Sequence, residues 1–335
     1  MTKIKFGVVG LGHIGKRHAE MILNHEEAEL VAVADILPIT KTNFTHTDVP
    51  YFSSLEELLD KAPEVEVVHI CTPNGLHAPQ SVLALQHRKH IVVEKPMALR
   101  KADCENILHV ALTNAKQVFV VMQNRYSPPS EWLKKVVDEG ILGEIYQVQI
   151  NCYWNRDDRY YKKDGWKGTQ ALDGGTLFTQ FSHFIDIMYW VFGDIQNIQA
   201  KFNDFNHTNS TEFEDSGNVI FDFVKGGAGC INYSTSVWDK NMESSLTVIG
   251  SKGSIKIGGQ YMDKIEYCHV ENYEMPILRP TNPANNYGPY QGSANNHMHV
   301  VENVINTLKG RTTVTTNALE GLKVVEIIER IYALK

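Results

Sequence analysis

Gly10-Leu-Gly-His-Ile-Gly15 directly follows an apolar run, Ile4 to Val9. A strand that leads into a Gly-x-Gly-x-x-Gly turn and then a helix is typical of a pyrophosphate-binding site. The first glycine allows the tight turn, the second lets the main chain approach the phosphates, and the third lets helix and strand pack closely. The helix N-terminus adds free N–H groups and a partial positive charge. Three glycines alone also suit an ordinary turn, but this context predicts a dinucleotide site. Its predicted contacts here are Gly10, Gly12, His13 and Ile14.

A carboxylate follows the second predicted strand, at the position where a dinucleotide site needs one. The run Glu29 to Ala34 ends in Asp35, about 20 residues beyond the glycines. A carboxylate there accepts hydrogen bonds from the adenosine ribose hydroxyls and repels a 2′-phosphate. The sequence therefore predicts NAD as cofactor in preference to NADP.

Size and charge exclude several classes of protein. The 335 residues suffice for two domains, at roughly 100–200 residues each. The net charge of −7 argues against a nucleic-acid binder. No apolar stretch reaches the ~18 residues of a membrane span, and the N-terminus enters the first strand without room for a signal peptide. We expect a cytoplasmic protein.

Cysteine and histidine patterns predict neither disulfides nor a metal site. The five cysteines lie far apart and form no Cys-x-x-Cys motif, which is typical of reduced thiols. His297 and His299 are close in sequence but have no carboxylate at a suitable spacing for zinc.

The pattern of the chain changes after about residue 125. Before it, strand and helix patterns alternate, which predicts a doubly wound parallel sheet. The expected strands are 4–9, 29–34, 65–71, 91–94 and 117–122, and the expected helices are 14–25, 53–61, 77–88 and 100–114. After it, successive strands with turns between them predict an antiparallel sheet. These strands are expected at 144–152, 194–203, 216–224, 227–237, 244–249 and 253–258, with a helix at 176–192, a loop at 259–293 and closing helices at 297–309 and 317–333.

Three constellations outside the glycine turn could carry chemistry. Cys71-Thr72-Pro73-Asn74, with His77, follows the third strand, where ligands of α/β sheets bind; its plain structural reading is a turn. Glu94-Lys95-Pro96 ends the next strand at the same edge and could bring a positive charge to a substrate, or form a surface ion pair.

The third constellation is a predicted helix that carries a histidine. Thr179, His183 and Asp186 would share one face of the 176–192 helix. The Asp186 carboxylate would then orient the His183 ring. A structural role for this histidine is the alternative.

Together these segments resemble the Gfo/Idh/MocA family of NAD(P)-dependent sugar and polyol oxidoreductases. The resemblance rests on GLGHIG, Asp35, CTPNGLH, EKP and GGTLFTQFSHFID, and covers essentially the whole chain. It implies an α/β protein with a Rossmann domain, residues 1–123, and a C-terminal α+β domain, residues 124–335, with a large, mainly antiparallel open sheet. The last helices of the chain could pack back on the first domain. It also implies a homo-oligomer, a dimer or a tetramer.

Other motifs are similar to one branch of this family, the UDP-N-acetyl-2-amino-2-deoxyglucuronate 3-dehydrogenases of surface-polysaccharide biosynthesis. They are Tyr153-Trp-Asn-Arg156, Gly165-Trp-Lys-Gly-Thr169 and Gln180-x-Ser-His183. Thr179 departs from the aspartate that many family members have at that position and from the amide typical of this branch. The resemblance leaves two alternatives, a dehydrogenase of a free sugar, inositol or other polyol, and a non-catalytic NAD-binding regulator.

The resemblance and the side-chain chemistry assign roles to the candidate residues. Lys95 and His183 are the expected catalytic pair: His183 removes the hydroxyl proton while Lys95 stabilises the alkoxide, although the sequence leaves open which of them takes the proton. The expected cofactor contacts also include Asp35, Thr72, Asn74, His77, Glu94, Lys95, Gln123 and Trp166. The expected substrate contacts are Lys95, Asn124, Arg125, Arg156, Thr179, Gln180 and His183, the arginines because guanidinium binds carboxylate and phosphate. A second substrate such as 2-oxoglutarate is left open.

Overall fold

The computed structural model describes residues 2–163, 165–288 and 290–335, which form two compact units. The first unit contains the residues up to Val121 together with His297–Val325. The second contains Met122–Asn296 together with Glu326–Lys335. The segment 297–325, which includes the first of the two closing helices, thus belongs to the first unit.

The first unit is built on a parallel sheet, as the sequence predicts, with six strands and not the expected five, because the short β3 was not predicted. Its strands are β1 (Ile4–Val9), β2 (Ala28–Ala34), β3 (Tyr51–Phe52), β4 (Val67–Ile70), β5 (His90–Val93) and β6 (Val118–Val120), in the order β3-β2-β1-β4-β5-β6. Every residue of β4 is buried, which explains the continuous Val/Ile pattern of a strand covered on both faces. The order reverses beside β1, so a crevice for a ligand is expected at the carboxyl ends of β1 and β4.

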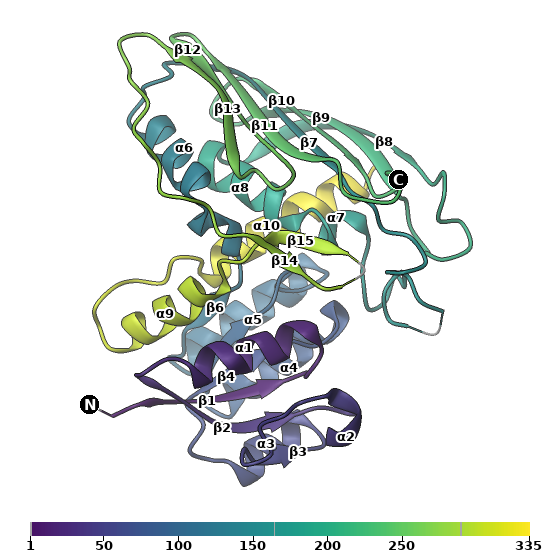
Figure 1. The fold of residues 1–335 in the computed structure, drawn as a ribbon, viewed down its shortest axis with the longest axis vertical. Coiled ribbons are helices and arrows are strands. Elements are labelled where there is room, and N and C mark those ends of the chain that lie inside the picture. Colours follow the sequence, from purple (N-terminus) through teal and green to yellow (C-terminus); the bar gives the residue numbers. More distant parts are fainter. Residues whose placement is uncertain (1, 164, 289) are drawn as a thin grey trace. The chain divides into compact units, whose positions relative to one another are not determined.

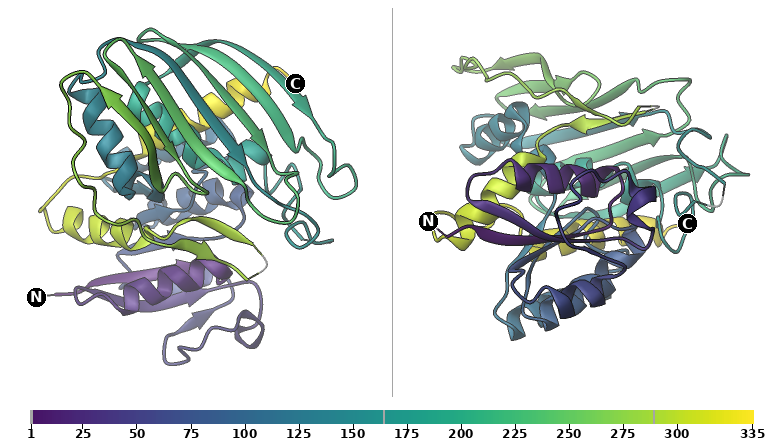
Figure 2. Two further views of the ribbon diagram at one scale, coloured as in Figure 1. Left: turned by 45° about the horizontal axis from the view of Figure 1, so that its top comes forward. Right: turned by 60° about the horizontal axis from the view of Figure 1, so that its bottom comes forward.

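Helices cover both faces of this sheet (Figure 2). They are α1 (His13–Leu23), α2 (Ile39–Thr42), α3 (Leu55–Lys61), α4 (Asn74–Gln86), α5 (Lys101–Thr113), α9 (His297–Leu308) and the start of α10 (Ala318–Tyr332). A capping box precedes the last of these: Glu320 N donates to Asn317 Oδ1 at 3.1 Å, and Asn317 N donates to Glu320 Oε2 at 3.2 Å.

The second unit is built on a seven-stranded, mainly antiparallel sheet (Figure 1). Its strands are β7 (Ile145–Tyr153), β8 (Ile195–Asn203), β9 (Ser216–Phe223), β10 (Ala228–Ser234), β11 (Glu243–Gly250), β12 (Gly253–Gly258) and β13 (Lys264–Val270), in the order β13-β12-β11-β7-β10-β9-β8. Among these, β7 and β10 pair in parallel. The expected open, mainly antiparallel sheet is confirmed.

Helices cover one face of the second sheet and leave the other face open (Figure 2). The unit contains the 3₁₀ helix η1 (Gln123–Tyr126) and the helices α6 (Pro128–Asp138), α7 (Thr176–Thr179) and α8 (Ser182–Phe192). Residues of β9 alternate between buried and exposed because one side meets these helices and the other does not.

Two sequence-based expectations about elements are wrong. The helix expected at 176–192 is broken: α7 ends at Thr179 and α8 begins at Ser182, with Phe181 at φ −117° and ψ 5°. The loop expected at 259–293 contains β13 and a small antiparallel pair, β14 (Ala284–Asn286) and β15 (Gln291–Ala294). Prolines and asparagines around these short strands hide their alternation.

Within the described residues, no helix combines the length and apolarity needed to cross a bilayer. No disulfide joins any of the five cysteines, all of which lie in the described ranges.

Candidate functional site

The glycine turn of the first unit has the geometry of a phosphate-binding loop. Gly10 has φ +86°, and a Cβ there would lie 2.7 Å from the Cys71 carbonyl oxygen. A Cβ on Gly15 would lie 1.7 Å from the Gly10 carbonyl oxygen. At Gly12 a Cβ would meet no protein atom within 4 Å. The fold of the protein thus requires glycine at the first and third positions. At the middle position, the missing side chain leaves open space that phosphates can occupy. The turn fits a dinucleotide.

Asp35 joins the second strand to this turn. It follows β2, and its two carboxylate oxygens accept hydrogen bonds from the main-chain N–H groups of Leu11 at 2.6 Å and Leu37 at 2.9 Å. A carboxylate has about four acceptor positions, so further acceptor positions suit ribose hydroxyls. His13 is exposed and Ile14 is half-buried in the first turn of α1. Their predicted cofactor contacts remain predictions.

His77, a predicted cofactor contact, lies against main-chain carbonyl groups of the first unit. Its Nδ1 lies 2.7 Å from the Pro96 carbonyl oxygen, and its Nε2 lies 2.9 Å from the Thr72 carbonyl oxygen. The ring is 1% exposed, and burial lowers the pKa of His77. Both ring nitrogens therefore lie against carbonyl oxygens inside the unit, and a neutral ring donates its one N–H to one of them. Thr72 Oγ1 donates to Gln80 Oε1 at 2.6 Å, and Asn74 is buried at the start of α4.

Glu94, also a predicted cofactor contact, directs its carboxylate into the unit. Its Oε1 lies 2.9 Å from His18 Nε2 and 3.8 Å from His297 Nε2, and its Oε2 accepts the N–H of Lys95 at 3.3 Å. Burial raises the pKa of Glu94, but the hydrogen bond from His18 and the charges of His18 and Lys95 outweigh burial and lower it to about 2. Glu94 therefore stays ionised and is held by histidines.

These histidines were not predicted from the sequence. His18 and Glu94 are 76 positions apart, and no motif links them. His18, Glu94 and His297 have the composition of a metal site, with one ligand atom of each within 4.8 Å of the others. The contacts of Glu94 with His18 and His297 already explain why these atoms lie close together. A second such group, Asp204, His207 and Asp215, lies beside β9, where Asp215 already accepts three hydrogen bonds, from Phe205 N, Asn206 N and Ser216 Oγ.

In the second unit, the helix break separates the polar residues that were expected on one face. Thr179 ends α7, and its hydroxyl donates to the Asp173 carboxylate. His183 lies in the first turn of α8 and is 5% exposed. Thr179 therefore belongs to a different helix from His183 and Asp186, and one helix face that carries all three does not form.

Arg125, a predicted substrate contact, forms a buried ion pair with Asp186. Arg125 Nε donates to Asp186 Oδ2 at 2.9 Å, and a terminal guanidinium nitrogen donates to Oδ1 at 2.7 Å. The exposed fractions of the two side chains are 1% and 0%. The bidentate pair engages the carboxylate that was expected to orient His183. It also engages one edge of the guanidinium that was expected to bind substrate. The expected substrate contact of Arg125 and the expected Asp186–His183 contact remain predictions.

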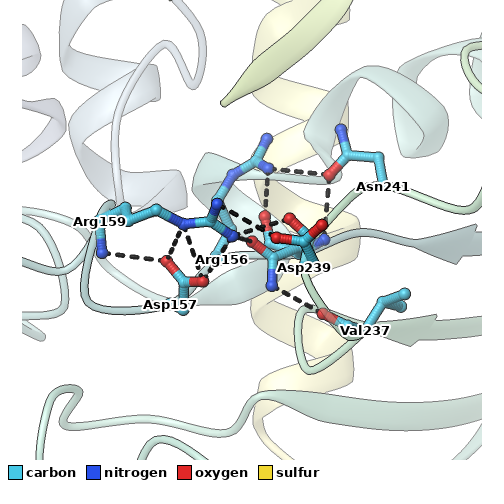
Figure 3. Close-up of polar contacts among 7 residues, drawn as sticks. Arg156, Asp157, Arg159, Val237, Asp239 and Asn241 are labelled. Atoms are coloured by element: carbon cyan, nitrogen blue, oxygen red, sulfur yellow. Dashed lines mark hydrogen bonds and ion pairs between the residues drawn. The ribbon is translucent and has the colours of Figure 1, made fainter. Parts of the chain in front are cut away.

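Arg156 lies among amide groups and aromatic rings. Figure 3 shows its contact with Asn241. Its Nε donates to Gln180 Oε1 at 2.7 Å, and its terminal nitrogens donate to the Asn155 carbonyl oxygen, Asn241 Oδ1 and the Gln291 carbonyl oxygen at 2.6, 3.1 and 3.2 Å. The rings of Trp154, Tyr160 and Tyr290 lie 4.8–5.3 Å from the guanidinium carbon. Burial lowers the pKa of Arg156 from its ordinary value, although four nearby tyrosines oppose this.

These contacts give Arg156 a defined effect on Gln180. Because Gln180 Oε1 accepts from Arg156, the amide orientation is fixed and its Nε2 faces another direction. That Nε2 is buried and has no hydrogen-bond partner among the described residues. Buried polar groups in folded proteins usually have a hydrogen-bond partner, so this N–H is available to a water or a ligand. Arg159, by contrast, is bound to Asp157 and to the Asp239 carbonyl oxygen at the surface (Figure 3).

Three further predicted residues lie in the second unit. Gln123 is 2% exposed and accepts the N–H of Asn296 at 2.8 Å. Asn124 is 4% exposed, and its amide donates to Ser293 Oγ at 3.4 Å. Trp166 is half-buried. Their predicted cofactor and substrate contacts remain predictions.

A parallel sheet with this glycine turn, Asp35 and a separate sheet unit define an NAD-binding oxidoreductase. The sequence match is more specific: residues 4–122 match the oxidoreductase family with an NAD-binding Rossmann fold, and residues 131–256 match the GFO/IDH/MocA C-terminal domain. The chain belongs to the GFO/IDH/MocA family, whose members include NAD-dependent sugar and polyol dehydrogenases.

Two solved structures resemble this chain over nearly their full length. The WlbA dehydrogenase of Bordetella pertussis, in complex with NADH and UDP-GlcNAcA, is 30% identical with a TM-score of 0.89, covering 99% of this chain and 95% of that one. The WlbA dehydrogenase of Chromobacterium violaceum, in complex with the same two ligands, is 31% identical with a TM-score of 0.89, covering 100% and 94%. The inositol 2-dehydrogenase of Rhizobium meliloti is 27% identical over 82% of each chain.

Proposed function

We propose that this protein oxidises the 3-hydroxyl of a UDP-N-acetylglucosaminuronate-type nucleotide sugar to a ketone, in the biosynthesis of surface-polysaccharide sugars. The observation that carries the proposal is the similarity to the two WlbA dehydrogenases, which were solved with UDP-GlcNAcA and NADH. Their identity and coverage exceed those of the inositol dehydrogenase.

The side chains of the second unit suit such a substrate. A nucleotide-sugar uronate carries a carboxylate and two phosphates. Arg156 places a positive charge among neutral amides and carbonyls, and the Gln180 amide that it orients retains a buried N–H donor. We propose that this N–H donates to a sugar or carboxylate oxygen, and that the buried charge favours the anionic substrate.

Two side chains are proposed to act on the reacting hydroxyl. NAD, when bound, supplies the hydride acceptor. His183 accepts the hydroxyl proton. An imidazole side chain suits this role because its ordinary pKa of ~6.5 leaves it mostly neutral at pH 7 and able to bind a proton. Lys95 donates a hydrogen bond to the same oxygen and stabilises its developing negative charge. The reverse assignment, with Lys95 as base, is the alternative that kinetics distinguish.

Substitutions test these roles. His183→Asn and Lys95→Met should each lower kcat by at least ~100-fold, because each removes an acid–base or charge-stabilising group. His109→Asn and Lys135→Met, which alter exposed side chains on α5 and α6, are the matched controls and should retain activity. Near-normal rates in both His183→Asn and Lys95→Met would contradict the assignment.

The second candidate function is a free-sugar or polyol dehydrogenase, which the inositol 2-dehydrogenase relative favours. A neutral substrate would not need the buried charge of Arg156. Parallel assays with myo-inositol, glucose and UDP-N-acetylglucosaminuronate distinguish the two candidates. The same assays with and without 2-oxoglutarate test whether it serves as a second substrate.

We further propose that the open face of the second sheet joins copies of the chain into a dimer or a tetramer. The strand register places Ile220 of β9, Ile249 of β11 and Tyr267 of β13 on this face. Their exposed fractions are 53%, 41% and 52%. Exposed apolar side chains that gather on one face are typical of an interface. Light scattering of the purified protein measures the number of chains; a monomer would contradict this proposal.

A further inference from the structure

The main chain on both sides of Lys95 is held by buried histidines of the first unit. Before Lys95, Glu94 accepts the Lys95 N–H at 3.3 Å through one oxygen and contacts His18 Nε2 at 2.9 Å through the other. After Lys95, the Pro96 carbonyl oxygen lies 2.7 Å from His77 Nδ1. The peptide groups that flank Lys95 thus have side-chain partners on both sides.

Each of these histidines is itself anchored to another element. His18 lies in α1, and its Nδ1 lies 2.7 Å from Nδ1 of His69 in β4. His77 lies in α4, and its Nε2 lies 2.9 Å from the Thr72 carbonyl oxygen. His18, His69 and His77 are 0%, 0% and 1% exposed. Close-packed side chains of this kind have little freedom to move. The positions of α1, β4 and α4 therefore determine the position of residues 94–96.

The charges around Glu94 strengthen this arrangement. An ionised carboxylate accepts hydrogen bonds more strongly than a neutral one. The groups that face it are His18 from α1, His69 from β4, His297 from α9 and Lys95 itself. Burial lowers the pKa of His297 to about 3 and that of His69 well below its ordinary value, so both rings stay neutral at neutral pH. The Glu94 carboxylate remains negative across the working range.

We infer that Glu94 and His77 are positioning residues that fix the main chain on either side of Lys95, with His18 holding Glu94 in place. The inference rests on the proposed role of Lys95 and deepens it: neither residue contacts the substrate, and both act through Lys95. A displacement of about 1 Å at a catalytic group can lower a rate by about 10²-fold. Loss of either anchor therefore lowers kcat while leaving substrate and cofactor binding largely intact.

A double-mutant cycle tests the inference. Glu94→Ala and His77→Ala should each lower kcat by about 10-fold or more, with KM and the NAD dissociation constant little changed. His77→Gln, whose amide N–H can still donate to a carbonyl, should recover part of the loss. In a Lys95→Met background, adding Glu94→Ala or His77→Ala should cause no further loss. Losses that multiply in that background would overturn the inference.

The control is His90→Ala. His90 lies on β5, four positions before Glu94, and its Nδ1 accepts the Gln117 N–H at 3.0 Å. This substitution removes a ring from the same strand without touching residues 94–96, so its kcat should match the wild type.

A second readout does not depend on turnover. The acylation rate of the Lys95 amine by acetic anhydride is followed by peptide mass spectrometry in the full-length protein with NAD. Glu94→Ala and His77→Ala should change this rate several-fold, while the rate at the exposed Lys61 stays constant. Unchanged Lys95 labelling would overturn the inference. Changed labelling in a protein that oxidises no nucleotide sugar would retain the inference and reject the proposed function.

Discussion

Buried histidines make the free energy of unfolding of the first unit depend on pH. Burial lowers the pKa of His297 to about 3, below the ordinary value of 6.5. Between these pH values the unfolded chain binds a proton that the folded chain excludes. The free energy of unfolding therefore falls as the pH falls from about 6.5 toward 3, by up to about 1.4 kcal/mol per pH unit for each such group. His69 contributes in the same direction.

Glu94 acts in a different pH window. Its folded pKa of about 2 lies below its ordinary value of 4.5, so the stability that it contributes is present above about pH 4.5 and is lost only between pH 4.5 and 2. Between pH 8 and pH 5 Glu94 therefore does not change the free energy of unfolding, and the contribution of the buried histidines is measured without it.

We predict that the melting temperature falls between pH 8 and pH 5, and that His297→Gln makes this decline shallower because glutamine does not titrate. Differential scanning fluorimetry at half-unit pH steps measures it. His109→Gln, an exposed histidine on α5, should reproduce the wild-type slope. Equal slopes for His297→Gln and the wild type would contradict the assignment.

The buried Arg125–Asp186 pair gives a second prediction at this scale. Arg125→Met leaves the Asp186 carboxylate buried without its guanidinium partner, which should lower the free energy of unfolding by about 3–5 kcal/mol. The double substitution Arg125→Met, Asp186→Leu should recover most of that loss. Urea denaturation measures both. A raised KM with unchanged stability in Arg125→Met would instead support the substrate contact expected from the sequence.

At the scale of elements, the junction between β1 and α1 separates a structural glycine from a binding glycine. Gly12→Ala should leave the melting temperature unchanged, because no protein atom lies within 4 Å of the added methyl group. It should raise the NAD dissociation constant at least ~10-fold, because the methyl group occupies the space predicted for the pyrophosphate. Titration calorimetry measures the binding.

Gly15→Ala is the matched comparison in the same turn. Its Cβ would lie 1.7 Å from the Gly10 carbonyl oxygen, so α1 must move away from β1 and the melting temperature should fall. Equal stability of the two variants would contradict the separate roles of the glycines.

Elements with a local signal were predictable from the sequence. The β1–turn–α1 unit, the parallel sheet and the Asn317–Glu320 capping box depend on neighbouring residues. The break between α7 and α8 depends on tertiary contacts, since Arg156 binds Gln180 across 24 positions. The partners of Arg125 and Glu94 lie 61 and 76 positions away. A single sequence shows residue types along the chain but not these distant partners. For this reason, Arg125 and Glu94 were expected to contact ligands, but their contacts within the protein were not predicted.

At the scale of the whole molecule, the family sets the reaction class and the second unit is proposed to set the substrate. The chain is an NAD-dependent oxidoreductase of the GFO/IDH/MocA family. Its similarity to the two WlbA dehydrogenases and the buried charge of Arg156 both favour an anionic nucleotide sugar. An enzyme that oxidises a neutral polyol would not need the buried charge of Arg156.

The most direct test is mass spectrometry of UDP-N-acetylglucosaminuronate after incubation with the protein and NAD, with and without 2-oxoglutarate. The predicted result is a product that has lost two hydrogens from the sugar, absent with His183→Asn and Lys95→Met. Formation that depends on 2-oxoglutarate would identify it as the second substrate. An unchanged nucleotide sugar, under conditions in which the same preparation oxidises inositol or a free sugar, would contradict the account.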